Sequence, residues 1–198
     1  MVMKNIYTRS YYLAKAILKP ILFLLYHPKI ENREYIPKEE PAILAGNHTH
    51  IFDPGCVAVS TNRQVHFLAK EFLFEYPIIG PLFKKVGCIK VLKDKHNDEA
   101  LNEAIKTLEN NEIIGIFPEG KVKTEDTILN RFRFGAVKMA KKVGCLIVPF
   151  AITGKYIPFF GNLRITFGKP IDVREMEVKE ATDYLYETVK ELIIANQH

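Results

Sequence analysis

The chain has 198 residues, which is enough for one domain with a substantial core, and its 47% hydrophobic and 26% charged content excludes a disordered chain. Its three cysteines contain no C-x-x-C pair, so we expect a reducing compartment and no disulfide framework. The formal net charge of +5 is matched by the basic residues that precede the first acidic residue, Glu31. A local excess of this kind predicts no nucleic-acid partner.

The first segment, residues 1–30, is both basic and apolar. Its apolar run, residues 11–26, is interrupted by Lys15, Lys19 and Pro20, whereas a transmembrane span needs about 20 mostly uncharged residues. The residues after the run do not form the small-residue cleavage site of a signal peptide. The pattern favours a helix at the membrane interface, because the two lysines lie one turn apart on one side. A helix packed on the protein's own core is the alternative.

Beyond a polar connector at residues 31–41, short apolar runs alternate with stretches of helical spacing. Such alternation predicts an α/β fold, a layered sandwich of a largely parallel central sheet with flanking helices. Prolines and a glycine within residues 70–86 predict bent helical pieces there rather than one straight helix. The expected strands are 42–45, 65–69, 88–92, 112–117, 145–152 and 163–167, and the expected helices are 54–60, 97–110, 134–143 and 178–195.

An imidazole and a carboxylate, His48 and Asp53, follow the first expected strand within the sequence NHTHIFDP. A continuous helix would point residues five apart to different sides, so the segment must turn. The turn can fold His48 against Asp53, and a carboxylate at the ring N–H would orient the imidazole as a base. Two alternatives are open: Asp53 serves only as the cap of a helix that begins at Pro54, or the pair and His50 bind a metal ion.

Several cations and one acid come directly after other expected strands. In parallel sheets the carboxyl ends of the strands meet at one rim, so these residues are expected near His48. Converging cations suit a ligand that carries phosphate, and solvated surface charge is the alternative. The candidates are Lys93, Glu119, Gly120, Lys121, Lys123, Arg131 and Arg133.

Four blocks of the chain, in order, resemble those of the lysophospholipid/glycerolipid acyltransferases, specifically the 1-acylglycerol-3-phosphate acyltransferases. The resemblance runs from about residue 30 to 170. Each block alone is a weak signal, whereas the ordered set is specific. The blocks are Asn47-His48-x4-Asp53, Gly87-x-Ile89-x-Val91-x-Lys93, Phe117-Pro118-Glu119-Gly120 and Val148-Pro149-Phe150-Ala151-Ile152.

The resemblance implies that His48 is the general base, that Asp53 is its partner, and that Lys93 and Glu119 bind the phosphate of the acceptor. Two departures from the family pattern affect the phosphate site. Lys93 stands where arginine is usual, which loses the bidentate fork. Lys121-Val122 replaces the usual threonine or serine and arginine after the third block. Lys121, Lys123, Arg131 and Arg133 are therefore candidates for holding part of the phosphate.

The implied reaction moves a fatty acyl group from acyl-CoA or acyl carrier protein to the sn-2 hydroxyl of lysophosphatidate, with no cofactor and no metal. We expect residues 31–198 to form the acyltransferase domain and residues 1–30 to rest on the cytoplasmic face of the membrane. The alternatives are another acceptor, such as glycerol-3-phosphate or a lysophospholipid, and a lipid-binding protein without turnover.

Overall fold

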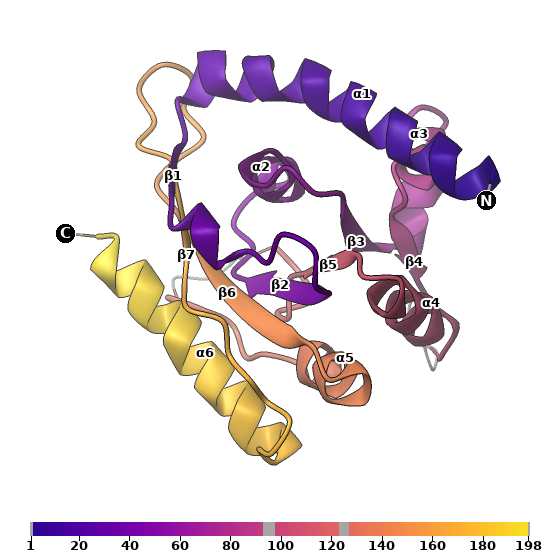
Figure 1. The fold of residues 1–198 in the computed structure, drawn as a ribbon. Coiled ribbons are helices and arrows are strands. Elements are labelled where there is room, and N and C mark those ends of the chain that lie inside the picture. Colours follow the sequence, from indigo (N-terminus) through magenta and orange to yellow (C-terminus); the bar gives the residue numbers. More distant parts are fainter. Residues whose placement is uncertain (1, 93–97, 123–126, 198) are drawn as a thin grey trace.

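The computed structural model describes residues 2–92, 98–122 and 127–197, which form three layers with a sheet in the middle (Figure 1). The expected α/β sandwich is confirmed. Within the described residues seven strands form one sheet in the order β1-β7-β6-β2-β5-β3-β4. The strands are β1 Lys29–Glu31, β2 Ala42–Gly46, β3 Val65–Lys70, β4 Ile89–Val91, β5 Ile113–Ile116, β6 Leu146–Thr153 and β7 Arg164–Phe167.

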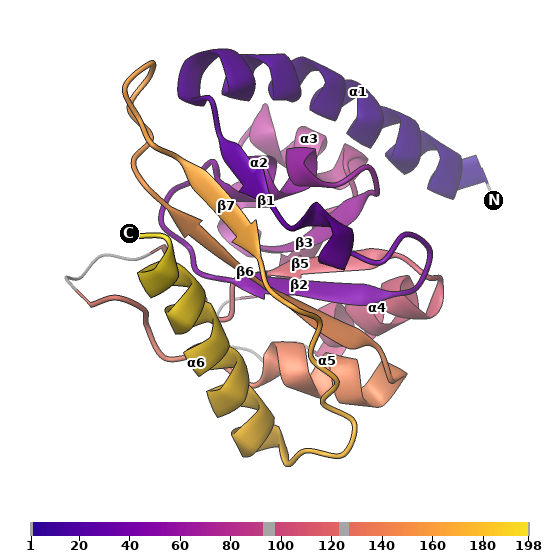
Figure 2. The same ribbon diagram turned by 60° about the vertical axis from the view of Figure 1, so that its left-hand side comes forward.

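Helices cover both faces of the sheet (Figure 2). The first two helices lie over one face, and the last three lie side by side over the other. The stretch between β3 and β4 is broken into short helical pieces, as its prolines predict. The helices are α1 Val2–Tyr26, α2 Asp53–Ser60, α3 Ile79–Lys85, α4 Asp98–Glu109, α5 Gly135–Val143 and α6 Val178–Ala195, with 3-10 turns η1 Arg33–Tyr35 and η2 Glu71–Phe74.

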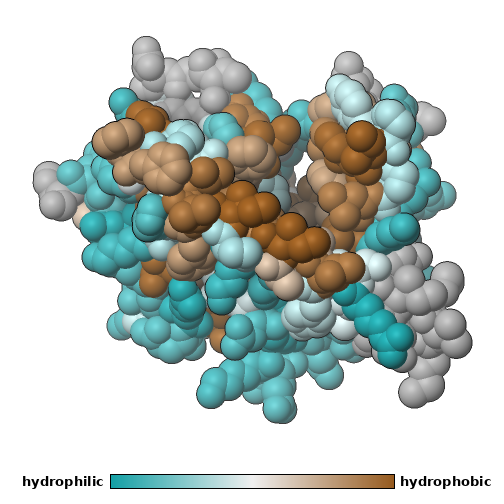
Figure 3. Space-filling model, turned by 90° about the horizontal axis from the view of Figure 1, so that it is seen from above, coloured by the Kyte–Doolittle hydropathy of each residue, from teal (hydrophilic) through white to brown (hydrophobic). Residues whose placement is uncertain are grey.

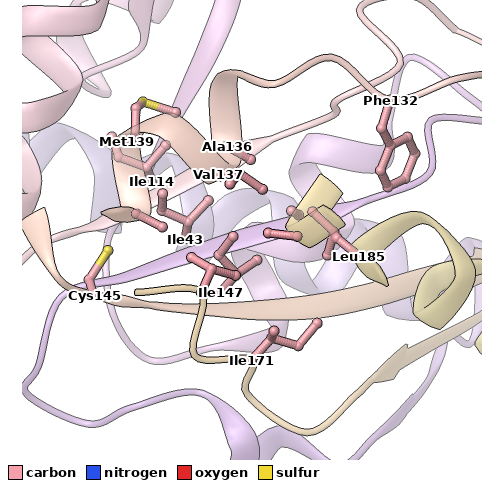
Figure 4. Packing of buried hydrophobic residues seen from close by; sticks show 14 of the residues in the cluster. Ile43, Ile114, Phe132, Ala136, Val137, Met139, Cys145, Ile147, Ile171 and Leu185 are labelled. Carbon is pink, nitrogen blue, oxygen red and sulfur yellow. The ribbon is translucent and has the colours of Figure 1, made fainter. Parts of the chain in front are cut away.

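The central strand β2 supplies both halves of the core because its side chains alternate between the two faces. Ile43 and Ala45 belong to the cluster under α4, α5 and α6, part of which is drawn in Figure 4. Ala42 and Leu44 belong to the cluster under α1 and α2. All four side chains are fully buried, which is why β2 reads as a continuous apolar run rather than an alternating one.

Three local features differ from the expectation. Strand β1 lies within a stretch divided between the basic segment and the polar connector, and it pairs in parallel with β7. Strand β7 pairs antiparallel with β6, so β7 and the edge strand β1 run against the rest of the sheet. Asp53 is not the cap of α2: Phe52 occupies that position, Asp53 is the first helical residue, and its carboxylate turns back to the loop before it.

Helix α1 has a buried side and an exposed side. Tyr11, Leu22 and Tyr26 pack in the cluster over α2, which agrees with the alternative of a helix packed on the core. Lys15 is partly turned inward, and its ammonium donates to the carbonyl of Thr61. Burial, and then the charge of the nearby Lys19, lower the pKa of Lys15 to about 8. No helix in the described part of the chain is long and apolar enough to cross a bilayer.

Candidate active site

Three neighbouring strands end at the same rim of the sheet. In the order β6-β2-β5 they run parallel, so the segments that follow them meet. β2 leads into residues 47–53, β5 into residues 117–120, and β6 into residues 154–156. The site is built from these three segments, which are far apart in the sequence.

The end of β2 is fixed to β6 by Asn47, a buried side chain. Its amide Nδ2 donates to the carbonyl of Ile152 (2.8 Å), and its Oδ1 accepts the N–H of the same residue (2.7 Å). The side chain thus continues the ladder after the backbone of β2 has turned away. Glycine is required at Gly46, because a Cβ there would lie 2.2 Å from the carbonyl oxygen of Phe150. These contacts fix the backbone position of the following residue, His48.

The turn brings His48 and Asp53 together, as their spacing predicts. Nδ1 of the imidazole lies 2.8 Å from Oδ2 of Asp53, whose side chain is fully buried. The same oxygen accepts the backbone N–H groups of Thr49 (2.5 Å) and His50 (2.8 Å). The Tyr156 hydroxyl donates to the other oxygen, Oδ1, at 2.6 Å. Every one of these contacts is donated to Asp53, an arrangement that suits an ionised carboxylate.

The imidazole of His48 is held between its partner and an aromatic ring. It stacks on Phe117, with centroids 4.1 Å apart and planes at 19°. Because Nδ1 faces Asp53, the ring nitrogen left for a substrate is Nε2, and the side chain is 17% exposed. A neutral imidazole with its proton on Nδ1 accepts at Nε2. The geometry is therefore that of a general base and its orienting carboxylate.

Glu119 is buried, and each of its oxygens accepts a backbone N–H. Oε1 accepts from His48 and Oε2 from Asn130, both at 2.8 Å. The carboxylate therefore joins the histidine segment to residues 129–133. The tight loop that carries it ends at Gly120, where φ is +71°, a conformation that favours glycine.

The structure brings some of the predicted cations close to this loop. The guanidinium of Arg133 lies over Gly120, since a Cβ built there would be 3.0 Å from Nε of Arg133. Arg131 is exposed on the same segment, and Lys121 is exposed beside Gly120. The predicted Lys93 and Lys123 lie outside the described residues.

The other nucleophile and ligand candidates are less suited to chemistry. The three cysteines are free thiols. Burial raises the pKa of Cys56 to about 11 and that of Cys88 to about 12, so both thiols stay protonated near neutral pH. Among the residues that the structure describes, no group of three His, Cys, Asp or Glu side chains could hold a metal ion. His50 instead stacks on Tyr156 at 4.3 Å.

Comparison with known proteins adds a family to this geometry. The family model described as Acyltransferase matches residues 27–153, a span that contains the whole turn from His48 to Asp53 and the Glu119 loop. The chain belongs to the acyltransferase family.

Relatives within the acyltransferase family cover most of the chain. A 1-acyl-sn-glycerol-3-phosphate acyltransferase of Bacillus subtilis is 31% identical, over 88% of this chain and 92% of its own length. One from Borreliella burgdorferi is 28% identical, over 83% of this chain and 67% of its own length. The crystal structure of PlsC, the 1-acyl-sn-glycerophosphate acyltransferase of Thermotoga maritima, has the same fold, with a TM-score of 0.75 and 24% identity over 96% of this chain and 78% of that chain.

Two residues of this acyltransferase site were not found from the sequence. Tyr156 follows β6 and reaches Asp53 across 103 positions, and Phe117 was seen only as part of a block. A signal for Tyr156 did exist. It follows a strand expected to be parallel, and the rule that places sites at strand ends applies to it as it does to His48.

Proposed function

We propose that this acyltransferase moves a fatty acyl group from an acyl thioester to the sn-2 hydroxyl of 1-acylglycerol-3-phosphate and so makes phosphatidate. The observation that carries the proposal is the buried pair of His48 and Asp53 at a rim where Arg133 and Lys121 also lie. The relatives from B. subtilis and B. burgdorferi are both named 1-acyl-sn-glycerol-3-phosphate acyltransferases, which supports the same acceptor.

The proposed reaction is direct transfer with His48 as base. Nε2 takes the proton of the sn-2 hydroxyl while its oxygen attacks the carbonyl carbon of the thioester. The new C–O bond forms, the C–S bond of the tetrahedral intermediate breaks, and the leaving thiolate takes the proton from the imidazolium. Asp53 keeps the ring in the productive tautomer and offsets the charge of the imidazolium. No covalent acyl-enzyme is needed, which agrees with the protonated thiols of Cys56 and Cys88.

General base catalysis supplies about 10²–10⁴-fold of the rate. Placing the hydroxyl against the thioester carbonyl adds a comparable or larger factor, provided that the acceptor is held firmly. In this proposal Arg133, Arg131 and Lys121 hold the phosphate, together with the predicted Lys93 and Lys123. Glu119 contributes by fixing the backbone. Its two oxygens accept the N–H groups of His48 and Asn130, so it holds the backbone of the base and the backbone just before Arg131.

The acceptor is a lipid, and the surface offers an apolar face to reach it. Seen from above, apolar side chains gather in two groups separated by a hollow (Figure 3). Exposed apolar residues lie on the outer side of α1, on the stretch from η2 to α3, and on the loop between β6 and β7, where Phe160 is 88% exposed. We propose that this face rests on the cytoplasmic side of a membrane, with residues 1–30 as the interfacial segment.

One assay tests the proposed reaction. The purified protein receives lysophosphatidate and a labelled acyl-CoA or acyl carrier protein, and phosphatidate is measured. Glycerol-3-phosphate and a neutral lysophospholipid serve as competing acceptors. We expect phosphatidate from lysophosphatidate, and a loss of at least about 100-fold in kcat for His48→Ala with unchanged unfolding temperature. Product from neither donor, or full activity of H48A, refutes the proposed reaction; acyl transfer only to another acceptor refutes the proposed substrate.

A flotation assay with vesicles tests the lipid face. Leu13→Glu together with Ile17→Glu places two charges on the exposed side of α1 and should reduce binding to anionic phospholipid vesicles. Tyr184→Glu is the matched control, because it changes an exposed aromatic residue on α6, over the opposite face of the sheet. Equal binding by all three proteins would contradict the proposed lipid face.

A further inference from the structure

The hydroxyl of Tyr156 is the closest contact of Oδ1 of Asp53. The two oxygens lie 2.6 Å apart, whereas the only other donor that reaches Oδ1 among the described residues, the Thr49 hydroxyl, is at 3.3 Å. Oδ2 already accepts from two backbone N–H groups and faces His48. The Tyr156 hydroxyl is thus the main hydrogen-bond donor to the Asp53 oxygen that faces away from His48.

The phenol remains a donor at every pH where the enzyme would work. Burial, and then the charge of Asp53, raise the pKa of Tyr156 far above its ordinary value. Its oxygen also lies 3.4 Å from Sγ of Cys56, whose thiol stays protonated up to about pH 11. Because the ionised carboxylate is the stronger acceptor, the phenolic proton points to Asp53.

The ring of Tyr156 is held from several sides. The ring of His50 stacks on it, with planes at 21°. The ring of Tyr26 of α1 packs against it in a T-shaped arrangement, with centroids 5.4 Å apart. Three residues further along, the N–H of Phe159 donates to the carbonyl of Leu25 at 2.6 Å. The loop that carries the tyrosine is therefore anchored to α1, and these contacts hold the hydroxyl in a fixed position.

We propose that Tyr156 is a positioning residue that fixes the carboxylate plane of Asp53 and tunes, through it, the basicity of His48. Without the hydroxyl, Oδ1 would keep only the long contact to Thr49 in a buried site, so the carboxylate plane could tilt while Oδ2 stays at Nδ1 through its two backbone donors. The hydroxyl also draws negative charge away from the side that faces the imidazole. Its loss would leave a more negative partner at Nδ1, which stabilises the imidazolium form.

Among the residues that the structure describes, few other groups lie against the His48 ring. Its ring faces the carboxylate of Asp53 and the uncharged Phe117, and its backbone N–H is bound to Glu119. The second titratable ring nearby, His50, stacks on Tyr156. The effect of removing the hydroxyl is therefore expected mainly through Asp53.

The test is Tyr156→Phe, which keeps the ring and its stacking. We expect kcat to fall by about 10-fold or more, from the loss of a hydrogen bond to a charged group, while KM for lysophosphatidate stays within about twofold. The acidic limb of the profile of kcat/KM against pH should move to higher pH by about half a unit or more. Tyr184→Phe removes a hydroxyl from an exposed ring on α6 and should leave both the rate and the limb unchanged.

A second measurement does not depend on turnover. The inference rests on the proposed function for its kinetic readout, whereas titration of the His48 ring by NMR in the substrate-free protein reports basicity directly. A raised midpoint in Y156F and an unchanged one in Y184F support the inference even if lysophosphatidate is not the acceptor. An unshifted midpoint in Y156F overturns it, as does a fall in kcat that accompanies only a lower unfolding temperature.

Discussion

Replacing Glu119 by glutamine tests whether this carboxylate acts by holding the backbone or by contacting the substrate. The carboxylate accepts the N–H of His48 and the N–H of Asn130, both at 2.8 Å, in a buried position. A glutamine of the same shape has one acceptor oxygen, and its NH₂ group would face a backbone donor. One of the two bonds is lost, and the other is no longer charge-assisted.

The expected cost follows from those two bonds. A hydrogen bond to a charged group contributes about 1.5–3 kcal/mol, and a neutral one about half of that. The loss of one and the weakening of the other amount to about 3 kcal/mol, which lowers Tm by roughly 6–12 °C in a domain of this size. Because the His48 N–H is released, kcat should also fall by about 10-fold, whereas KM for lysophosphatidate should change less.

The assay combines thermal unfolding with steady-state kinetics on E119Q and on Glu109→Gln, a control that removes the same charge from an exposed position on α4. E109Q should match the wild type in both measurements. The reasoning would be refuted by an E119Q protein that keeps its Tm but binds lysophosphatidate far more weakly. In that case the carboxylate would contact the acceptor directly, as the sequence resemblance alone implies.

Three further predictions concern residues around the site and on α1. Asn47→Ala leaves the N–H and the carbonyl of Ile152 without partners and should lower the free energy of urea unfolding by about 2–4 kcal/mol; an unchanged midpoint would contradict the pairing. Cys56→Ala with Cys88→Ala should retain most of the phosphatidate synthesis, and abolished activity would instead indicate an acyl-enzyme. The unfolded chain keeps the Lys15 proton up to about pH 10.5 and the folded chain only to about 8, so stability should rise between these values; Lys15→Met should lose this rise in chemical unfolding measured at pH 7.5 and 10.

Much of the fold could be predicted because its elements carry strong local patterns. The helix expected at 178–195 begins and ends as predicted, since its apolar residues recur at helical spacing over several turns. Strand β1 could not be predicted, because three residues at a sheet edge are too few to show a period. The reversal of β7 is linked to its short connection to β6, residues 154–163, which holds no helix, whereas a parallel connection needs a crossover of about a dozen residues or more.

The site divides in the same way. The pairing of His48 with Asp53 is local, because a turn over five positions determines it, and the spacing predicted it. The partners of Glu119 and the contact from Tyr156 depend on three strand ends that meet only in the folded sheet. The family resemblance implies that Glu119 binds the acceptor, whereas the sequence alone does not reveal that backbone N–H groups donate to both of its oxygens.

The anchoring of the Tyr156 loop to α1 affects how the enzyme should be engineered. A shortened protein that begins after Tyr26 would be a natural choice for easier purification and crystallisation. It would uncover the side chains over α2 and remove the carbonyl of Leu25 that holds Phe159. In such a truncated protein, a loss of membrane binding could not be distinguished from damage to the active site. Substitutions on the outer side of α1, with the helix retained, are the cleaner way to separate the two.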